Sequence, residues 1–146
     1  QLYKHGVKPE WIELEITEGH MMKNHLEMIE TLQKISDLGV SISIDDFGTG
    51  YSSLSLLKKL PIDRLKIDKS FIVDLPDDEE DIVIVDSIIA LAKSLDLDVI
   101  AEGIESKEQA EFLKSKNCTY VQGHYYYHPL PVYDITALLS NKSEQV

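Results

Sequence analysis

The sequence is poor in the features that mark secreted, membrane and nucleic-acid-binding proteins. Its one cysteine, Cys118, cannot form an internal disulfide and fits a reducing compartment, and we expect the thiol to be buried as a small hydrophobe. No apolar run approaches the roughly 20 residues of a membrane span, which argues against direct membrane insertion. There is no basic patch, and a net charge of −12 should repel a nucleic acid polymer. We therefore expect a cytoplasmic protein, or the cytoplasmic part of a larger, even membrane-anchored, protein.

The first residues of the sequence carry no start or targeting signal. Residues 1–5 contain neither an initiator Met nor the charge pattern and apolar stretch of a signal peptide, so we expect a piece of a longer protein. A length of 146 residues suits one domain, expected over 1–140, followed by a polar tail over 141–146. The acidic run Asp77–Asp81 suits the start of a helix, because negative charge is favoured there by the helix dipole.

Short strand patterns alternate with helical ones along the chain. Helical spacing or helix-start signals mark residues 26–38, 52–60, 82–95, 106 onward and 132–139, and Ser106–Gln109 fits a capping box. Strands separated by helices indicate βαβ units and hence a parallel sheet. The predicted strands are Trp11–Thr17, Val40–Asp45, Arg64–Asp68, Val99–Glu102 and Tyr120–Gln122.

The face pattern of these strands decides between an open sheet and a barrel. In a doubly wound sheet helices cover both faces, so strands read as continuous apolar runs. Here the first three strands carry polar residues on one face, which a barrel lumen with a polar mouth explains better. We predict an α/β fold, an incomplete TIM-type (β/α) barrel with five of its eight strands and the other three upstream of the first residue.

The predicted strands also end on polar residues. In barrel enzymes the working groups come from the carboxyl ends of several strands, which meet at one mouth. A single Glu or Lys at a strand end is more often a solvated edge, so the argument depends on the shared position of all of them. The strand-end residues are Glu15, Asp45, Asp46, Lys66, Glu102 and Gln122.

The adjacent carboxylates of Asp45 and Asp46 are the sharpest local feature. The Gly-rich turn Phe47–Gly50 that follows could swing both toward one centre, although a turn alone would also explain it. Carboxylates suit Mg²⁺ and Mn²⁺, and two such ions about 3.5–4 Å apart form the clamp of many phosphodiester hydrolases. Lys66 could then orient the attacking water or neutralise phosphate charge, or it could be a lumen lysine paired with Glu102.

Five segments of the sequence resemble, in order and in spacing, successive motifs of the EAL family. The resemblance covers nearly the whole chain, from about residue 7 to residue 139, and it implies a barrel that hydrolyses cyclic di-GMP to linear pGpG with two Mg²⁺ or Mn²⁺ ions. It makes cyclic di-GMP the expected ligand. The five segments are Glu13–Glu18, Asp45–Leu54, Leu60–Asp68, Ala101–Glu105 and Val121–Gly123.

The same resemblance assigns roles to individual residues. It implies metal ligands at Glu15, Asp45 and Asp46, and catalytic residues at Lys66 and Glu102. It implies that one further carboxylate braces the loop after Asp46, near the dimer interface of the family. That residue is Glu18. The resemblance further implies three residues that contact the substrate or support the metal ligands, namely Gln122, Glu105 and Asp68.

Two departures from the family pattern bear on activity. The Glu-Ala-Leu strand, which supplies a metal ligand, is absent, and so is an upstream Asn ligand. We therefore expect a phosphodiesterase in the parent protein and little or no activity in this chain alone, unless it pairs with the missing half of the barrel or forms a homodimer. The alternative is a non-catalytic cyclic di-GMP receptor, but such receptors usually lose one or more of the carboxylates that this chain retains.

Overall fold

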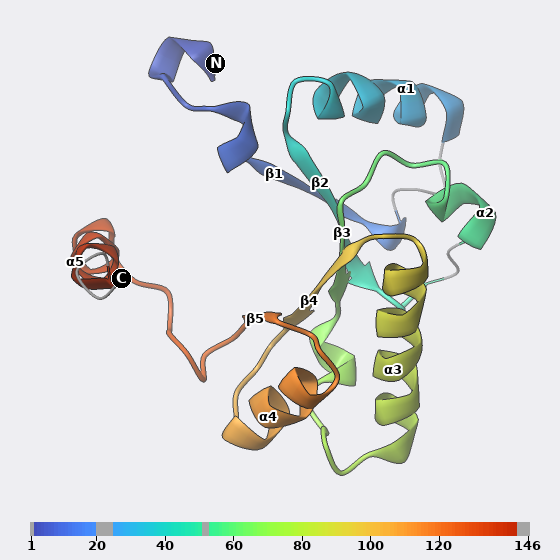
Figure 1. The fold of residues 1–146 in the computed structure, drawn as a ribbon, viewed down its shortest axis with the longest axis vertical. Coiled ribbons are helices and arrows are strands. Elements are labelled where there is room, and N and C mark those ends of the chain that lie inside the picture. The colour runs from blue at the N-terminus through green and yellow to red at the C-terminus, as the bar shows by residue number, and fades with distance from the viewer. Residues whose placement is uncertain (1, 20–24, 51–52, 143–146) are drawn as a thin grey trace.

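One parallel sheet organises the molecule (Figure 1). The computed structural model describes residues 2–19, 25–50 and 53–142, and within them the strand order is β1-β2-β3-β4-β5 with every neighbouring pair parallel. This confirms the five predicted strands and their parallel arrangement. The strands are β1 (Glu13–Thr17), β2 (Ser41–Phe47), β3 (Arg64–Ile67), β4 (Asp98–Glu102) and β5 (Tyr120–Gln122).

Helices connect each strand to the next. The predicted helix over 52–60 is described only from residue 53, and the predicted tail only to residue 142. Short 3-10 segments add η1 (Tyr3–His5), η2 (Pro9–Trp11) and η4 (Lys69–Phe71). The α-helices are α1 (His25–Ser36), α2 (Leu54–Leu57), α3 (Glu79–Ser94), α4 (Lys107–Ser115) and α5 (Val132–Lys142).

Two helix starts follow from the local sequence. The Asp78 carboxylate accepts hydrogen bonds from the backbone N–H groups of Glu80 (2.8 Å) and Asp81 (3.0 Å), so the acidic run does begin α3. At α4, Ser106 and Gln109 form a capping box, as the sequence predicts. Both caps satisfy N–H groups that have no partner inside their helix.

The hydrophobic core lies on one face of the sheet, between the strands and the helices. Leu65 and Ile67 of β3 are fully buried there. Burial of each such side chain stabilises the fold by about 1.5–3 kcal/mol. Cys118 belongs to this core, as expected from the sequence. Since the opposite face of the strands is polar, the sheet has the one-sided covering of a barrel wall rather than that of a doubly wound sheet. Other core members are Ile42, Ile44, Val85, Ile88, Ala92, Ala101 and Leu113.

Two strand boundaries differ from the prediction by two residues, and three others differ by one. Trp11 lies in η2 and is 66% exposed, so β1 begins at Glu13 rather than at Trp11. Strand β2 continues past Asp45 to Phe47, because Asp46 has a φ of +56° and the pairing with β3 shifts register between Ile44 and Phe47. Such a bulge lets a strand absorb an extra residue and continue.

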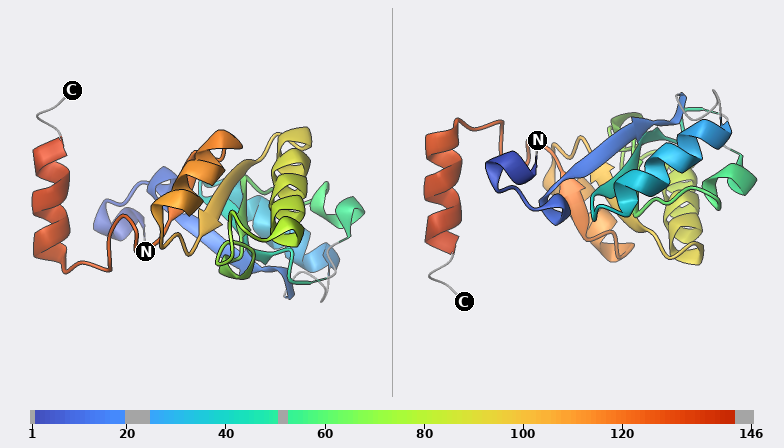
Figure 2. Two further views of the ribbon diagram at one scale, coloured as in Figure 1. Left: turned by 90° about the horizontal axis from the view of Figure 1, so that it is seen from below. Right: turned by 90° about the horizontal axis from the view of Figure 1, so that it is seen from above.

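The last helix stands apart from the sheet. All views place α5 away from the other helices, joined to β5 by an extended segment (Figures 1 and 2). Strands β1 and β5 are the edges of the sheet in the described part of the chain.

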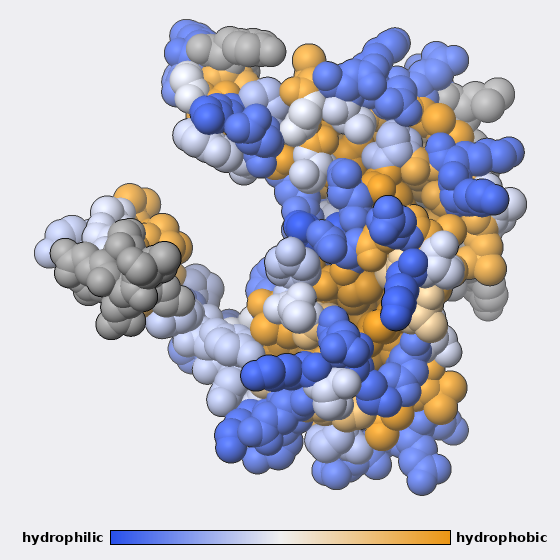
Figure 3. Space-filling model, in the orientation of Figure 1, coloured by the Kyte–Doolittle hydropathy of each residue, from blue (hydrophilic) through white to orange (hydrophobic). Residues whose placement is uncertain are grey.

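The space-filling view shows a hollow between α5 and the N-terminal part, with hydrophilic residues along the strands (Figure 3). None of the described helices has both the length and the apolar surface that crossing a bilayer requires.

Candidate active site

Strand β3 carries the central residue of the candidate site. Side chains of successive strand residues point to opposite faces, so burial of Leu65 and Ile67 against the helices turns Lys66 to the polar face. The register sets β2 on one side of Lys66 and β4 on the other, with β1 beyond β2. The carboxyl ends of four strands therefore surround this lysine.

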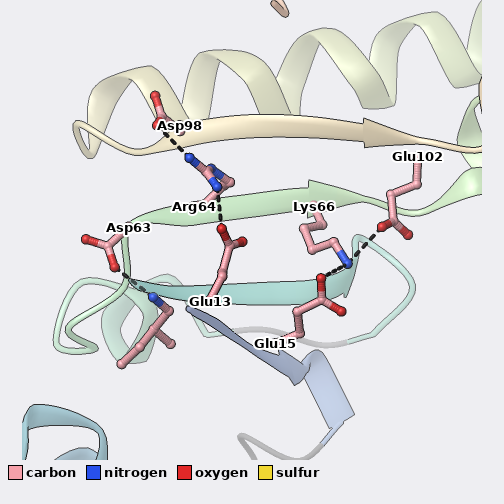
Figure 4. Close-up of polar contacts among 8 residues, drawn as sticks. Glu13, Glu15, Asp63, Arg64, Lys66, Asp98 and Glu102 are labelled. Carbon is pink, nitrogen blue, oxygen red and sulfur yellow. Dashed lines mark hydrogen bonds and ion pairs between the residues drawn. The ribbon is translucent and has the colours of Figure 1, made fainter. Parts of the chain in front are cut away.

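Three carboxylates from three different strands meet at the Lys66 ammonium, and Figure 4 shows two of them, Glu15 and Glu102. Its Nζ lies 2.7 Å from Glu15 Oε1 of β1, 3.0 Å from Asp45 Oδ1 of β2 and 2.8 Å from Glu102 Oε1 of β4. The Lys66 side chain is 4% exposed, whereas that of Glu15 is half exposed. The cluster thus has a buried cation at its centre, two largely covered carboxylates, Asp45 and Glu102, and one open carboxylate, Glu15.

Charge and burial act in opposite directions on the lysine. Burial alone would lower the pKa of Lys66, but hydrogen bonds to Glu102, Glu15 and Asp45 outweigh it and raise the pKa above its ordinary value. Lys66 therefore carries its positive charge at neutral pH. Because three carboxylates face one ammonium, the cluster retains an excess of negative charge.

A second pair of carboxyls lies beside this cluster. Burial, followed by the negative charges of Asp45 and Asp68, raises the pKa of Asp46. For Asp68 burial acts in the same direction, but hydrogen bonds from Ser70 and Asp46 outweigh it and lower the pKa. One of those bonds runs from the Ser70 backbone N–H to Asp68 Oδ1 at 2.9 Å and caps η4. The structure thus brings Asp46 and Asp68 together with Asp45 at the same end of the sheet.

Glu18 holds the loop that follows β2. Its carboxylate is 4% exposed, and Oε2 accepts hydrogen bonds from the backbone N–H groups of Gly48 (3.0 Å) and Gly50 (3.1 Å). A Cβ on Gly50 would lie 2.9 Å from the Glu18 carboxylate, so a side chain there would push the carboxylate away. This is the contact that the resemblance implies for Glu18. The neighbouring motif residues 51 and 52 lie outside the described residues.

A cavity of about 480 Å³ opens at the ends of β4 and β5. Three predicted site residues, Glu102, Glu105 and Gln122, line it together with Lys69 and Tyr127. Of the three consecutive tyrosines at 125–127, Tyr127 lines the cavity. All three tyrosines are 42–51% exposed, which is more open than packing alone suggests.

The carboxylate oxygens of the site are suitable ligands for a hard divalent cation, but their positions are set by their ion pairs with Lys66. Carboxylate oxygens are the ligands that Mg²⁺ and Mn²⁺ prefer. Yet in residues 2–19, 25–50 and 53–142 no group of three or more His, Cys, Asp or Glu is arranged to hold a metal ion. The carboxylates of Glu15, Asp45 and Glu102 gather around Lys66 instead.

A second network at the opposite end of β3 was not found from the sequence. Arg64 forms ion pairs with Glu13 and with Asp98 (3.3 Å) (Figure 4). Its guanidinium lies 5.2 Å from the centre of the Tyr120 ring. The available signal was the two-residue spacing of Arg64 and Lys66, which puts both on one face of the strand. From the sequence, an ion pair with Glu102 was one alternative for Lys66, whereas its ion pairs with Glu15 of β1 and Asp45 of β2 were not predicted.

Comparison with known proteins identifies the family. The EAL domain model matches residues 1–129. Over 127 residues the chain is 48% identical to the cyclic di-GMP phosphodiesterase NbdA of Pseudomonas aeruginosa, an alignment that covers 87% of this chain and 16% of NbdA. The chain thus spans about a sixth of the length of this curated relative.

Solved structures agree in fold as well as in sequence. "PaMucR Phosphodiesterase, c-di-GMP complex" superposes with a TM-score of 0.87 at 43% identity, over 92% of this chain and 54% of that one. Klebsiella pneumoniae BlrP1, solved with cyclic di-GMP and either manganese or calcium, gives a TM-score of 0.78 at 31% identity, over 85% of this chain and 32% of that one. Together with the matched residues and the one-sided parallel sheet, these likenesses establish that the chain belongs to the EAL domain family and forms the C-terminal part of its barrel.

Proposed function

We propose that the protein carrying this chain hydrolyses cyclic di-GMP to linear pGpG. One observation carries the proposal: carboxylates from β1, β2 and β4 converge on the buried Lys66 at the carboxyl ends of the strands. In a parallel barrel this is the end where catalytic groups gather. The names of the relatives, a cyclic di-GMP phosphodiesterase and complexes with cyclic di-GMP, support the choice of substrate.

The proposal includes two divalent cations, Mg²⁺ or Mn²⁺. Glu15, Asp45 and Asp46 would hold them, since these carboxylates stand at the ends of β1 and β2 and have the oxygen donors that such ions prefer. When bound, the ions would supply a hydroxide at neutral pH and neutralise charge on the phosphodiester. The manganese complex of BlrP1 supports a divalent ion in this family.

The residues of the chain divide the remaining work. Lys66 donates hydrogen bonds as a buried ammonium, and it can orient the attacking water and neutralise charge that develops on the phosphate. Glu102 bonds to that ammonium and also lines the cavity, so it links the lysine to the bound dinucleotide. Glu105 and Gln122 belong to the cavity wall and contact the substrate, and Asp68 supports Asp46 from behind.

Closure of the site is also part of the proposal. Strands β1 and β5 are the edges of the described sheet, and an uncovered strand edge readily pairs with another strand. We propose that further strands, from the rest of the protein or from a second copy, pair there and complete the metal ligands. The unpaired, buried Cys118 supports a reducing, cytoplasmic setting.

Hydrolysis of cyclic di-GMP by the protein carrying this chain, with Mn²⁺ and with Asp45→Asn as the control, tests the proposal. We expect linear pGpG from the wild-type protein and none from the variant. Binding without turnover by the wild-type protein would instead identify a receptor. The absence of both binding and turnover would overturn the proposed substrate.

A further inference from the structure

Gln109 occupies an unusual position for a helix-capping residue. It is 5% exposed, and it is one of four buried polar or charged side chains in the part of the chain that the structure describes. Its backbone N–H donates to Ser106 Oγ at 3.2 Å, which is one half of the capping box that begins α4. Its side chain extends from there toward the segment that follows β3.

Every hydrogen-bonding position of the Gln109 amide is used. Oε1 accepts from the backbone N–H groups of Glu105 (2.8 Å) and Ser106 (3.0 Å). Nε2 donates to the carbonyl oxygens of Ile72 (3.0 Å) and Val73 (3.1 Å). An amide has two donor hydrogens and two acceptor lone pairs, so these four bonds exhaust it, and the partners fix which end is oxygen.

The capping box alone does not require glutamine. The box needs only an acceptor at this position, and Glu serves there as well as Gln. The donor half of the amide is demanded by the carbonyls of Ile72 and Val73, 37 and 36 residues earlier in the chain. A carboxylate can only accept, whereas the amide accepts from one segment and donates to the other, so the choice of Gln over Glu reflects the link between the two segments.

Both linked segments carry walls of the cavity. In the first segment, Lys69 begins η4, which ends just before Ile72. In the second, Glu105 directly precedes Ser106, the cap of α4. Both Lys69 and Glu105 line the cavity. The segments also touch directly, because a Cβ on Gly103, whose φ is +74°, would lie 2.6 Å from Lys69 Cβ. Gln109 therefore holds two parts of the cavity wall at a fixed separation while contacting their backbones rather than the cavity.

We propose that Gln109 is a positioning residue that sets the affinity of the site for its substrate, an inference that rests on the proposed hydrolysis of cyclic di-GMP. Gln109→Glu retains the acceptor for Glu105 and Ser106 but turns a carboxylate oxygen toward two carbonyl oxygens. Repulsion then separates the segment after β3 from the start of α4. We expect KM for cyclic di-GMP to rise about tenfold, with kcat changed by less than about threefold, as for loss of a group that orients others.

Steady-state kinetics of the protein carrying this chain, with Mn²⁺, tests the inference on matched variants. Gln109→Met keeps the length and burial of the side chain without a new charge, and the same rise in KM is expected. Ser106→Ala removes only the cap of α4, so it should lower the melting temperature and leave KM unchanged. A merely structural role would instead lower kcat with the folded fraction at constant KM.

The outcomes separate this inference from the proposed function. If the wild-type protein is active but both Gln109 variants keep its KM, the inference is wrong and the proposed function stands. A rise in KM for Ser106→Ala equal to that of Gln109→Met would assign the effect to the cap and also overturn it. A wild-type protein that neither binds nor hydrolyses cyclic di-GMP overturns the proposed function and the inference together.

Discussion

Two charge networks lie on the polar face of the sheet, one at each end of strand β3, and each surrounds a cation. At the start of the strand Arg64 has two carboxylate partners and an aromatic ring, and its side chain is 22% exposed. At the end of the strand Lys66 has three carboxylate partners and is 4% exposed. The two cations are only two positions apart along the chain, with Leu65 between them.

The difference lies in geometry and in charge balance. A guanidinium is a rigid planar fork with a permanent charge, which suits a fixed clamp between strands. An ammonium is a compact charge on a flexible stem, and the three carboxylates around Lys66 leave a larger surplus of negative charge than the two around Arg64. In parallel barrels the carboxyl ends of strands carry chemistry and the amino ends carry stability, so we assign these two roles to the two networks.

The largest expected effect comes from removing the buried lysine. Lys66→Met should lower kcat for cyclic di-GMP by about 10²–10³-fold, because it removes a preorganised cation from the site where charge develops. Initial rates with Mn²⁺ give the change. A variant within threefold of the wild-type rate would remove Lys66 from the reaction.

A smaller loss of activity is expected from the loop that follows β2. Glu18→Ala leaves the N–H groups of Gly48 and Gly50 without their acceptor, and we expect about a tenfold loss of kcat/KM as the adjoining Asp46 becomes misplaced. Glu18→Gln is the matched control, since its amide oxygen still accepts. If Glu18→Ala has the wild-type kcat/KM, the loop does not need its brace.

The network at the start of β3 should affect stability instead. Arg64→Met leaves Glu13 and Asp98 without their partner, so we expect urea unfolding to show a loss of about 1–2 kcal/mol for these partly exposed pairs. Arg64→Lys should recover part of it. An unchanged urea midpoint for Arg64→Met would mean that this network does not stabilise the sheet.

The smallest expected effect is a change in the reactivity of the Cys118 thiol, which lies at the end of the sheet where Arg64 is found. Burial raises the pKa of Cys118 from 9.0 to about 11, so the thiol should react slowly with a disulfide reagent at pH 8. Because the folded pKa is the higher one, its contribution to stability is fully present below about pH 9 and is lost as the pH rises toward 11.

The labelling rate of Cys118 therefore distinguishes the roles of the networks at the two ends of β3. Cys118 Sγ lies 3.9 Å from the Val99 carbonyl oxygen and 3.6 Å from that of Tyr120, near the starts of β4 and β5. We expect faster labelling in Arg64→Met and the wild-type rate in Lys66→Met. Equal rates in the two variants would contradict a separate stabilising role for the Arg64 network.

The strands could be predicted from the sequence because alternation is a local signal. Ile42 and Ile44 alternate with Ser41 and Ser43, and the structure buries both isoleucines against the helices. The exceptions are also local in origin. The predicted strand included Trp11, yet the preceding Pro9 starts a 3-10 turn that delays β1. The positive φ of Asp46 has no signature in a run of apolar and acidic residues.

The contacts of the candidate site could be predicted only in part, because they depend on register across several strands. The shared strand-end position predicted that these residues meet at one mouth, and Glu102 was a possible partner of Lys66. Glu15 reaches Lys66 from two strands away, and no spacing along the chain reveals that ion pair. The same reason hides the partners of Arg64. For Gln109 the capping box was visible in the sequence, whereas its bonds to the carbonyls of Ile72 and Val73 were not.

The central claim is that one end of β3 serves chemistry and the other stability. Its most direct test is the rate of cyclic di-GMP hydrolysis by Lys66→Met and Arg64→Met, measured side by side with Mn²⁺ at a temperature where both variants are folded. The account predicts a loss of about 10²–10³-fold for Lys66→Met and a rate within about twofold of wild type for Arg64→Met. Equal losses in both variants, or a larger loss for Arg64→Met, would contradict it.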